Sequence, residues 1–145
     1  MDTQTTTTDS TATTATTATT GNNAAPAGIT VVYKWTANPG QLGALTDIYR
    51  SVTDAMEANE PGATNVHVYE SPDENAIYVR DEFADAAAMG FHLGTTAAAH
   101  FPDLLAIAVP GPFFFLGDVP AEMKAHVEQM QLGGQFATHA AGYDR

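Results

Sequence analysis

The sequence predicts an α+β domain with the ferredoxin-like split β-α-β arrangement, in which helices cover one face of an antiparallel sheet. Two observations carry this prediction. Segments with two-residue alternation and segments with helical periodicity follow one another in the order strand, helix, strand, strand, helix, strand. The two middle strands are separated only by residues typical of a turn, as in an antiparallel hairpin.

The ordered domain is expected to span residues 29–145. The preceding residues, 1–28, consist mainly of Thr and Ala and contain no aromatic side chain. Such a segment cannot bury enough surface to offset the entropy lost on ordering, so we expect a disordered tail. Thr interrupts every candidate for the apolar core of a secretory signal. The cytoplasm is therefore the expected compartment.

The first strand begins at Ile29, where the sequence ITVVYKWTA is rich in β-branched and aromatic residues. Asn38 is a candidate cap for the helix that follows, with Pro39 suited to its first turn. Residues 42–56 then carry apolar side chains at helical spacing, and Glu60-Pro61-Gly62 ends the pattern. One amphipathic helix should therefore cover the sheet.

The hairpin is predicted from residues 64–71 and 75–83, with a turn at Ser71-Pro72-Asp73-Glu74. In the second of these strands, alternation places one set of side chains on a common face, namely Ile77, Val79, Asp81 and Phe83. Asp85 is suited to cap the next helix, on which Ala88, Met89 and His92 share a face. The imidazole of His92 is therefore predicted to be buried or half-buried.

The C-terminal part of the sequence predicts one more core strand and an extension. Residues 101–109 are apolar enough for either a short helix or part of a strand, and Pro110-Gly111-Pro112 is expected to end that segment. Residues 113–116 (FFFL) are typical of a strand buried on both faces. A helix from Pro120 to Gln131 and an added strand within residues 135–143 make up the predicted C-terminal helix/strand extension.

The uncovered face of the predicted sheet needs a partner. Strands one and four carry apolar or aromatic side chains on either face, so a monomer would expose a larger apolar patch than soluble monomers usually tolerate. We therefore expect a homodimer in which two sheets pack face to face.

Charge and composition exclude several classes of partner. Five basic against 17 acidic residues give a net charge of −12, which opposes binding to nucleic acid or to an anionic membrane surface. No apolar run approaches the roughly 20 residues that span a bilayer, so we expect a soluble protein. The absence of cysteine excludes disulfides, a thiolate nucleophile and Cys-ligated metal sites.

One motif resembles a known family. The residues that carry the resemblance are Asp81-Glu82-Phe83, Asp85, Ala88, Met89, His92-Leu93, Thr95 and His100-Phe101. They resemble the antibiotic biosynthesis monooxygenase family of dimeric α+β barrel proteins, and the order of elements agrees from Ile29 to about Leu116. The gap of eight residues between the two histidines is longer than the usual family pattern.

The resemblance implies a cofactor-independent oxidation of quinols, anthrones or similar small phenolic substrates by molecular oxygen. Such a site removes a proton from the substrate and shields the resulting anion from water. His92 is the candidate catalytic base, because its reference pKa of about 6.5 is close to working pH. The alternative role for His92 is structural, with its ring bonded to a backbone carbonyl group.

Several other residues are candidates for substrate binding. Tyr33, Trp35, Tyr69 and Tyr78 would supply ring walls and hydroxyl donors if their strand faces turn toward the helices. His67 is expected to line either the pocket or the dimer interface. His100 is a secondary candidate, for which an interaction with the C-terminal end of a helix is the favoured role.

Other chemistries are disfavoured. Glu122 and His126 are four residues apart on a predicted helix, but no second pair at ligand spacing accompanies them, so no metal site is expected. Residues 29–37 lack the Asn that haem-degrading relatives use. No nucleophile elbow or phosphate-cradling glycine loop is present.

Two alternatives to the monooxygenase remain. One is a non-catalytic small-ligand-binding, stress or regulatory barrel, and the other is an isomerase or decarboxylase that uses the same base without oxygen.

Overall fold

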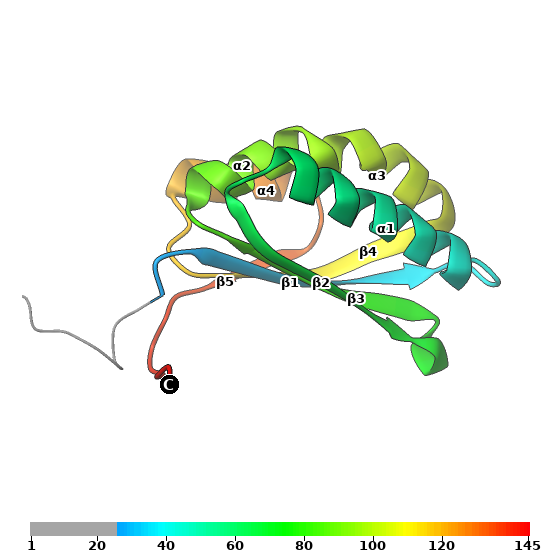
Figure 1. Cartoon of the computed structure of the whole chain (residues 1–145), viewed down its shortest axis with the longest axis horizontal. Coiled ribbons are helices and arrows are strands. Elements are labelled where there is room, and N and C mark those ends of the chain that lie inside the picture. The colour runs from blue at the N-terminus through cyan, green and yellow to red at the C-terminus, as the bar shows by residue number, and fades with distance from the viewer. Residues whose placement is uncertain (1–25) are drawn as a thin grey trace, which may run out of the picture. The chain divides into compact units, whose positions relative to one another are not determined.

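A five-stranded sheet with helices on one face forms the core of the molecule (Figure 1). The computed structural model describes residues 26–145, so the predicted tail, 1–28, lies almost wholly outside the described residues. Residues Pro26–His139 form one compact unit. The elements are β1 (Ile29–Ala37), α1 (Leu42–Asn59), β2 (Ala63–Ser71), the 3-10 turn η2 (Pro72–Glu74), β3 (Ala76–Phe83), α2 (Ala86–Gly94), α3 (Thr96–Ile107), β4 (Ala108–Leu116), α4 (Ala121–Gln129) and β5 (Gly134–Ala137).

The strand order β2-β3-β1-β4-β5 confirms the predicted ferredoxin-like core. β1 pairs antiparallel with both β3 and β4, and β2 pairs antiparallel with β3. β5 joins parallel to β4, which makes the sheet mixed and confirms that the extension adds a strand. No described helix combines the length and the apolar character needed to cross a bilayer.

The face of the sheet beneath the helices carries the core. On β1 the odd-numbered positions from Ile29 to Ala37 are buried, and on β3 the predicted set Ile77, Val79, Asp81 and Phe83 is buried. The alternation predicted for β3 is therefore confirmed, and β1 shows the same pattern. It places one carboxylate, that of Asp81, among apolar side chains on this face.

The predicted cap of the first helix, Asn38, lies three residues too early. Gln41, and not Asn38, precedes α1, and the carbonyl group of Asn38 accepts a hydrogen bond from the Gln41 N–H at 2.9 Å. Gly40 lies between them with φ of +78°, a left-handed conformation that a helix cannot include. Asn38-Pro39-Gly40 is therefore a turn that precedes the helix.

The segment from residue 95 to residue 116 settles the question that the sequence left open. Thr95 separates α2 from α3, and α3 extends through Phe101 to Ile107, after which β4 begins at once. Pro110-Gly111-Pro112 was expected to end this segment but lies inside β4. The ladder shifts between the pairs Trp35–Pro110 and Tyr33–Phe113, so a bulge takes up the residues that cannot pair.

The extension is shorter than predicted. α4 ends at Gln129 and β5 ends at Ala137, and the described residues 140–145 contain neither helix nor strand. Residues 113–116 were expected to be buried on both faces, but of these four only Phe113 and Phe115 are buried, while Phe114 and Leu116 are 39% and 40% exposed. The side chains that point away from the helices are therefore uncovered in the single chain.

Candidate active site

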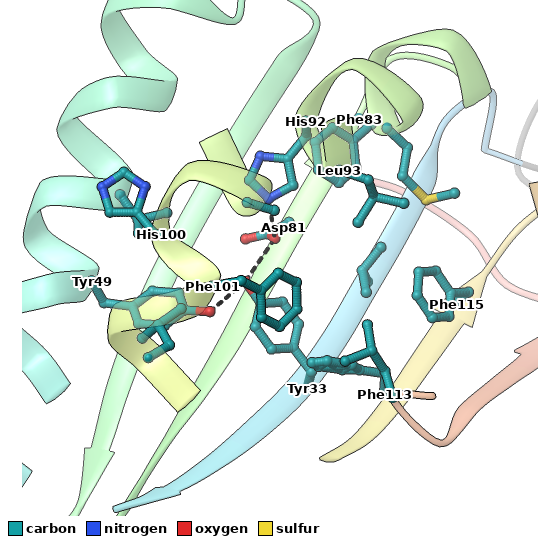
Figure 2. Close-up of a pocket in the computed structure, with 16 residues that line it drawn as sticks. Tyr33, Tyr49, Asp81, Phe83, His92, Leu93, His100, Phe101, Phe113 and Phe115 are labelled. Carbon is teal, nitrogen blue, oxygen red and sulfur yellow. Dashed lines mark hydrogen bonds and ion pairs between the residues drawn. The ribbon is translucent and has the colours of Figure 1, made fainter. Parts of the chain in front are cut away.

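A partly open cavity lies between the sheet and helices α1 to α3 (Figure 2). Its volume is about 50 Å³, enough for a few water molecules. Most of its wall is apolar, and its polar side chains come from β1, β3 and helices α1 to α3. The lining residues are Val31, Tyr33, Tyr49, Val52, Asp81, Phe83, Met89, His92, Leu93, Ala97, His100, Phe101, Leu104, Phe113, Phe115 and Leu132.

His92 is fixed by a buried carboxylate. The helix that carries it, α2, begins with the predicted cap, in which Asp85 accepts a hydrogen bond from the Ala88 N–H at 2.8 Å. Nδ1 of His92 lies 3.2 and 3.1 Å from the two carboxylate oxygens of Glu60. Both side chains are buried. Because an ionised carboxylate only accepts hydrogen bonds, Nδ1 carries the proton in this pair and Nε2 faces the cavity side.

Glu60 reaches His92 because the loop after α1 approaches α2 closely. The backbone N–H of Glu60 caps α1 by bonding to the carbonyl oxygen of Met56 at 2.8 Å. Two residues later Gly62 packs so tightly that an added Cβ would lie 2.6 Å from the Cβ of Ala88. A residue without a side chain at position 62 therefore brings the end of α1 against the helix that carries His92.

Asp81 supplies a second buried carboxyl group near His92 (Figure 2). Its Oδ2 accepts a hydrogen bond from the hydroxyl group of Tyr33 at 3.0 Å and lies 4.0 Å from Nε2 of His92. The hydroxyl group of Tyr49 in turn donates to the Tyr33 oxygen at 3.3 Å. Oδ1 of Asp81 is buried and has no hydrogen-bond partner among the described residues. It is therefore a free acceptor in the same cavity that His92 lines.

Burial changes the acid–base properties of Asp81 and Tyr33. Removal from water raises the pKa of Asp81 to about 6, against the opposing effects of the neighbouring His92 and of the hydrogen bond from Tyr33. Burial, reinforced by the negative charge of Asp81, raises the pKa of the Tyr33 hydroxyl well above its usual value. Tyr33 therefore remains a protonated donor, while Asp81 changes its charge close to working pH.

The structure brings three of the predicted site residues together. His92, Tyr33 and His100 all line the cavity. His100 lies in the middle of α3, where its Nδ1 pairs with the carbonyl oxygen of Thr96 at 2.8 Å, so the favoured interaction with a helix end is wrong.

The other predicted residues lie elsewhere. Trp35 is 1% exposed and belongs to the core beside the cavity, with ring centroids 5.8 Å from Phe101 and 6.4 Å from Phe113. Tyr69 and Tyr78 pair across β2 and β3 on the face that turns away from the helices, so the condition for their role in the pocket is not met. His67 lies on the same face and is exposed at the edge strand.

Three functional candidates were missed at the sequence level, namely Glu60, Asp81 and Tyr49. Glu60 was assigned only to the end of a helix, although it is buried. Asp81 carried a usable signal, because an acidic residue alternated with apolar residues on a face predicted to be buried. Tyr49 lay in an apolar helical stripe, which gave no sign of its hydroxyl contact. Among the described residues, no group of three or more His, Asp or Glu side chains is arranged to hold a metal ion.

The fold has counterparts among solved structures. MupZ from Pseudomonas fluorescens aligns with a TM-score of 0.67 and 16% identity, over 81% of this chain and 94% of its own. SnoaB, a cofactor-independent oxygenase from Streptomyces nogalater, aligns with a TM-score of 0.54 and 17% identity, over 65% of this chain and 95% of its own. The NE2512 protein of Nitrosomonas europaea gives a TM-score of 0.52 and 24% identity, over 68% and 99% of the two chains. These likenesses establish the fold.

The family of the chain follows from its sequence. No curated protein matches the chain by sequence. A family model does match, over residues 28–103, a range that runs from β1 into α3. The match includes His92, Asp81 and Glu60. The chain therefore belongs to the antibiotic biosynthesis monooxygenase family.

Proposed function

We propose that this protein is a cofactor-independent monooxygenase that oxidises a quinol, anthrone or similar phenolic substrate with molecular oxygen. The observation that supports it best is the buried pair of Glu60 and His92, whose second ring nitrogen faces an apolar cavity. The family of the chain and the description of SnoaB as a cofactor-independent oxygenase agree with this proposal.

The first step is removal of a proton from the substrate. Glu60 holds the Nδ1–H of His92, which leaves the lone pair on Nε2 available as a base and stabilises the imidazolium that forms. The free Oδ1 of Asp81 accepts a hydrogen bond from a substrate hydroxyl group. Together these groups hold a phenolic oxygen at the polar end of the cavity while His92 takes the proton.

The second step uses the electron-rich anion. For an anthrone, the carbanion adds to oxygen at the ring carbon, and the hydroperoxide then loses water to leave a carbonyl group. One oxygen atom enters the product and the other leaves as water, so the CH2 group and O2 balance without another reductant. The apolar walls exclude bulk water from the anion and from its oxygen adduct.

The cavity must widen to hold such a substrate. Its volume of about 50 Å³ is well below the roughly 150 Å³ of an apolar cavity that binds benzene. The half-buried side chains of Leu93 and Phe101 form part of its wall. Binding is therefore expected to displace side chains of the cavity wall.

The decisive experiment is oxygen uptake by metal-free protein with a panel of quinols and anthrones. His92→Ala is compared with His126→Ala, because His126 is an exposed histidine on α4 and serves as the matched control. We expect saturable uptake that falls by about 10²- to 10⁴-fold in His92→Ala and is unchanged in His126→Ala. Equal loss in both variants, or full activity in His92→Ala, would refute the role of His92.

One observation favours a second candidate, an isomerase that uses no oxygen. Because the pKa of Asp81 is raised to about 6, this side chain can return a proton to one carbon after His92 removes a proton from another. Turnover without oxygen uptake, with deuterium incorporated from D2O, would identify this reaction. Binding of a phenol without any turnover would instead support the non-catalytic binding module.

A further inference from the structure

The cavity has a polar and an apolar end. In Figure 2 His92, Asp81 and Tyr49 gather on one side, whereas Phe113 and Phe115 lie on the other. The strand order explains this division, because Asp81 lies on β3, and β1 separates that strand from β4, which carries the two phenylalanines. A ligand that satisfies both ends has a hydroxyl group at one end and an apolar substituent at the other.

The apolar end is closed by Leu132, which comes from the turn between α4 and β5. Its side chain lines the cavity and is 7% exposed. The next residues enter β5, where Gly134 lies opposite Phe113. Among the described residues that line the cavity, Leu132 is the one that belongs to neither a helix nor a strand.

The turn that carries Leu132 is held at both ends but is irregular between them. Gln131 and Gly133, on either side of Leu132, have φ of +55° and +68°. On the side of α4, Val127 is fully buried, and on the side of β5 the ring of Phe136 stacks on Phe115 at 5.2 Å. The extension thus anchors a short irregular turn whose central side chain projects into the cavity.

This wall does not belong to the matched part of the family. The family model ends at residue 103, so α4, Leu132 and β5 all lie beyond it. The groups that would do the chemistry lie within the match, whereas the residues of the apolar end, Phe113, Phe115 and Leu132, lie outside it. A feature that limits the size of the substrate is therefore placed where it can vary without disturbing the chemistry.

We propose that Leu132 is a specificity-determining residue, which sets how long an apolar substituent a phenolic ligand can carry opposite its hydroxyl group. This inference rests on the proposed function for the choice of a phenol. The ring hydroxyl contacts Oδ1 of Asp81, and the substituent extends past Phe113 and Phe115 toward Leu132. Loss or enlargement of the Leu132 side chain changes the permitted length and leaves the polar end intact.

The experiment measures the affinity of the full chain for a series of 4-alkylphenols, from 4-methylphenol to 4-hexylphenol, by isothermal titration calorimetry. In the wild type the affinity should stop rising after a short substituent. In Leu132→Ala it should continue to rise by about fourfold for each further methylene group, the equivalent of about 0.8 kcal/mol. Leu132→Phe should shorten the limit and lower the affinity for the longer phenols by about tenfold.

The matched control is Leu105→Ala, which removes the same atoms from a leucine that is 55% exposed on α3 and does not line the cavity. It should bind the whole series as the wild type does. Circular dichroism melts establish that each variant is folded, and if Leu132→Ala is unfolded at the working temperature, the loss of affinity in Leu132→Phe decides the question.

The outcomes separate this inference from the proposed function. A shift in length preference with Leu132, in a protein that shows no oxygen uptake, would uphold the specificity role and refute the monooxygenase. The same length dependence in the wild type and in both Leu132 variants would overturn the inference. Failure of every alkylphenol to bind would overturn it as well, because the ligand class would be wrong.

Discussion

At the scale of single residues, Asp81 is a buried carboxyl group with incomplete hydrogen bonding. It is 2% exposed in the middle of a three-strand segment of the sheet, with one oxygen bound by Tyr33 and the other without a partner among the described residues. An ionised carboxylate in such surroundings destabilises the folded state. A buried carboxyl group that destabilises the folded state is typical of a functional site.

The pH dependence of stability tests this assignment through Asp81→Asn. Because the folded state raises the pKa of Asp81 from 3.8 to about 6, the stabilisation by its proton is complete below pH 3.8 and is lost as the pH rises through 6. Over that range the wild type should lose up to about 3 kcal/mol of unfolding free energy relative to Asp81→Asn. Urea unfolding of both proteins at pH 4, 5, 6 and 7 measures the difference, and parallel curves would contradict it.

Glu60 acts through His92, so its removal should have a different signature. Glu60→Gln keeps the size of the side chain but removes the charge that stabilises the imidazolium. If the proposed function holds, we expect oxygen uptake to fall by about 10- to 100-fold, less than in His92→Ala, with a change in the pH–rate profile. A uniform loss at all pH values, with no change in the profile, would indicate only a structural role.

The sequence allowed part of this site to be predicted. The spacing of Ala88, Met89 and His92 on one helical face was sufficient to predict a buried imidazole, and the structure confirms it. The partner of His92 was not predictable, because Glu60 is 32 residues away and its contact depends on how a loop packs against α2. Local periodicity specifies which side of an element is buried, but not which buried groups of distant elements meet.

At the scale of elements, the close approach of the α1–β2 loop to α2 predicts that a side chain at position 62 destabilises the fold. In Gly62→Ala the added methyl group would lie 2.6 Å from the Cβ of Ala88, so α2 must shift. We expect a loss of about 1–3 kcal/mol in unfolding free energy, measured by urea denaturation. The shift would also separate Glu60 from His92.

Gly43→Ala is the matched control for this prediction. Gly43 lies within α1, and an added Cβ would have no heavy atom within 4 Å. Alanine is favoured over glycine in a helix, so this variant should be as stable as the wild type or up to about 1 kcal/mol more stable. Equal destabilisation by both substitutions would show that the Gly62 contact has no special role.

The elements that the sequence predicted well are those whose pattern is local. β1 and the buried face of β3 follow from alternation, and the start of α2 follows from the side chain of Asp85. Pro110-Gly111-Pro112 misled the prediction, because a strand can bypass unpaired residues with a bulge when its partner β1 continues on both sides. That outcome depends on pairing with a strand more than 70 residues earlier, which no local signal contains.

At the scale of the whole molecule, the uncovered sheet face predicts a homodimer. Tyr69, Tyr78, Val109, Phe114 and Leu116 are large apolar or aromatic side chains that are 37–60% exposed on this face. Soluble monomers rarely expose a continuous patch of this kind. We expect sedimentation velocity to find a dimer at micromolar concentration, with Phe114→Asp shifting the protein toward monomer.

The control for the dimer prediction is Leu105→Asp, which places the same charge on a similarly exposed leucine of α3, on the helical side of the sheet. It should sediment as the wild type does. Monomer alone in the wild type, or dissociation by both substitutions, would contradict a dimer formed through the sheet.

The position of Trp35 makes its fluorescence a probe of the cavity. It is the single tryptophan of the chain, fully enclosed, and its ring lies beside Phe101, which is part of the cavity wall. Its emission therefore arises from one dry environment and should lie at short wavelength. A ligand that displaces Phe101 would change that emission, so binding can be followed in the unlabelled protein before any substrate is known.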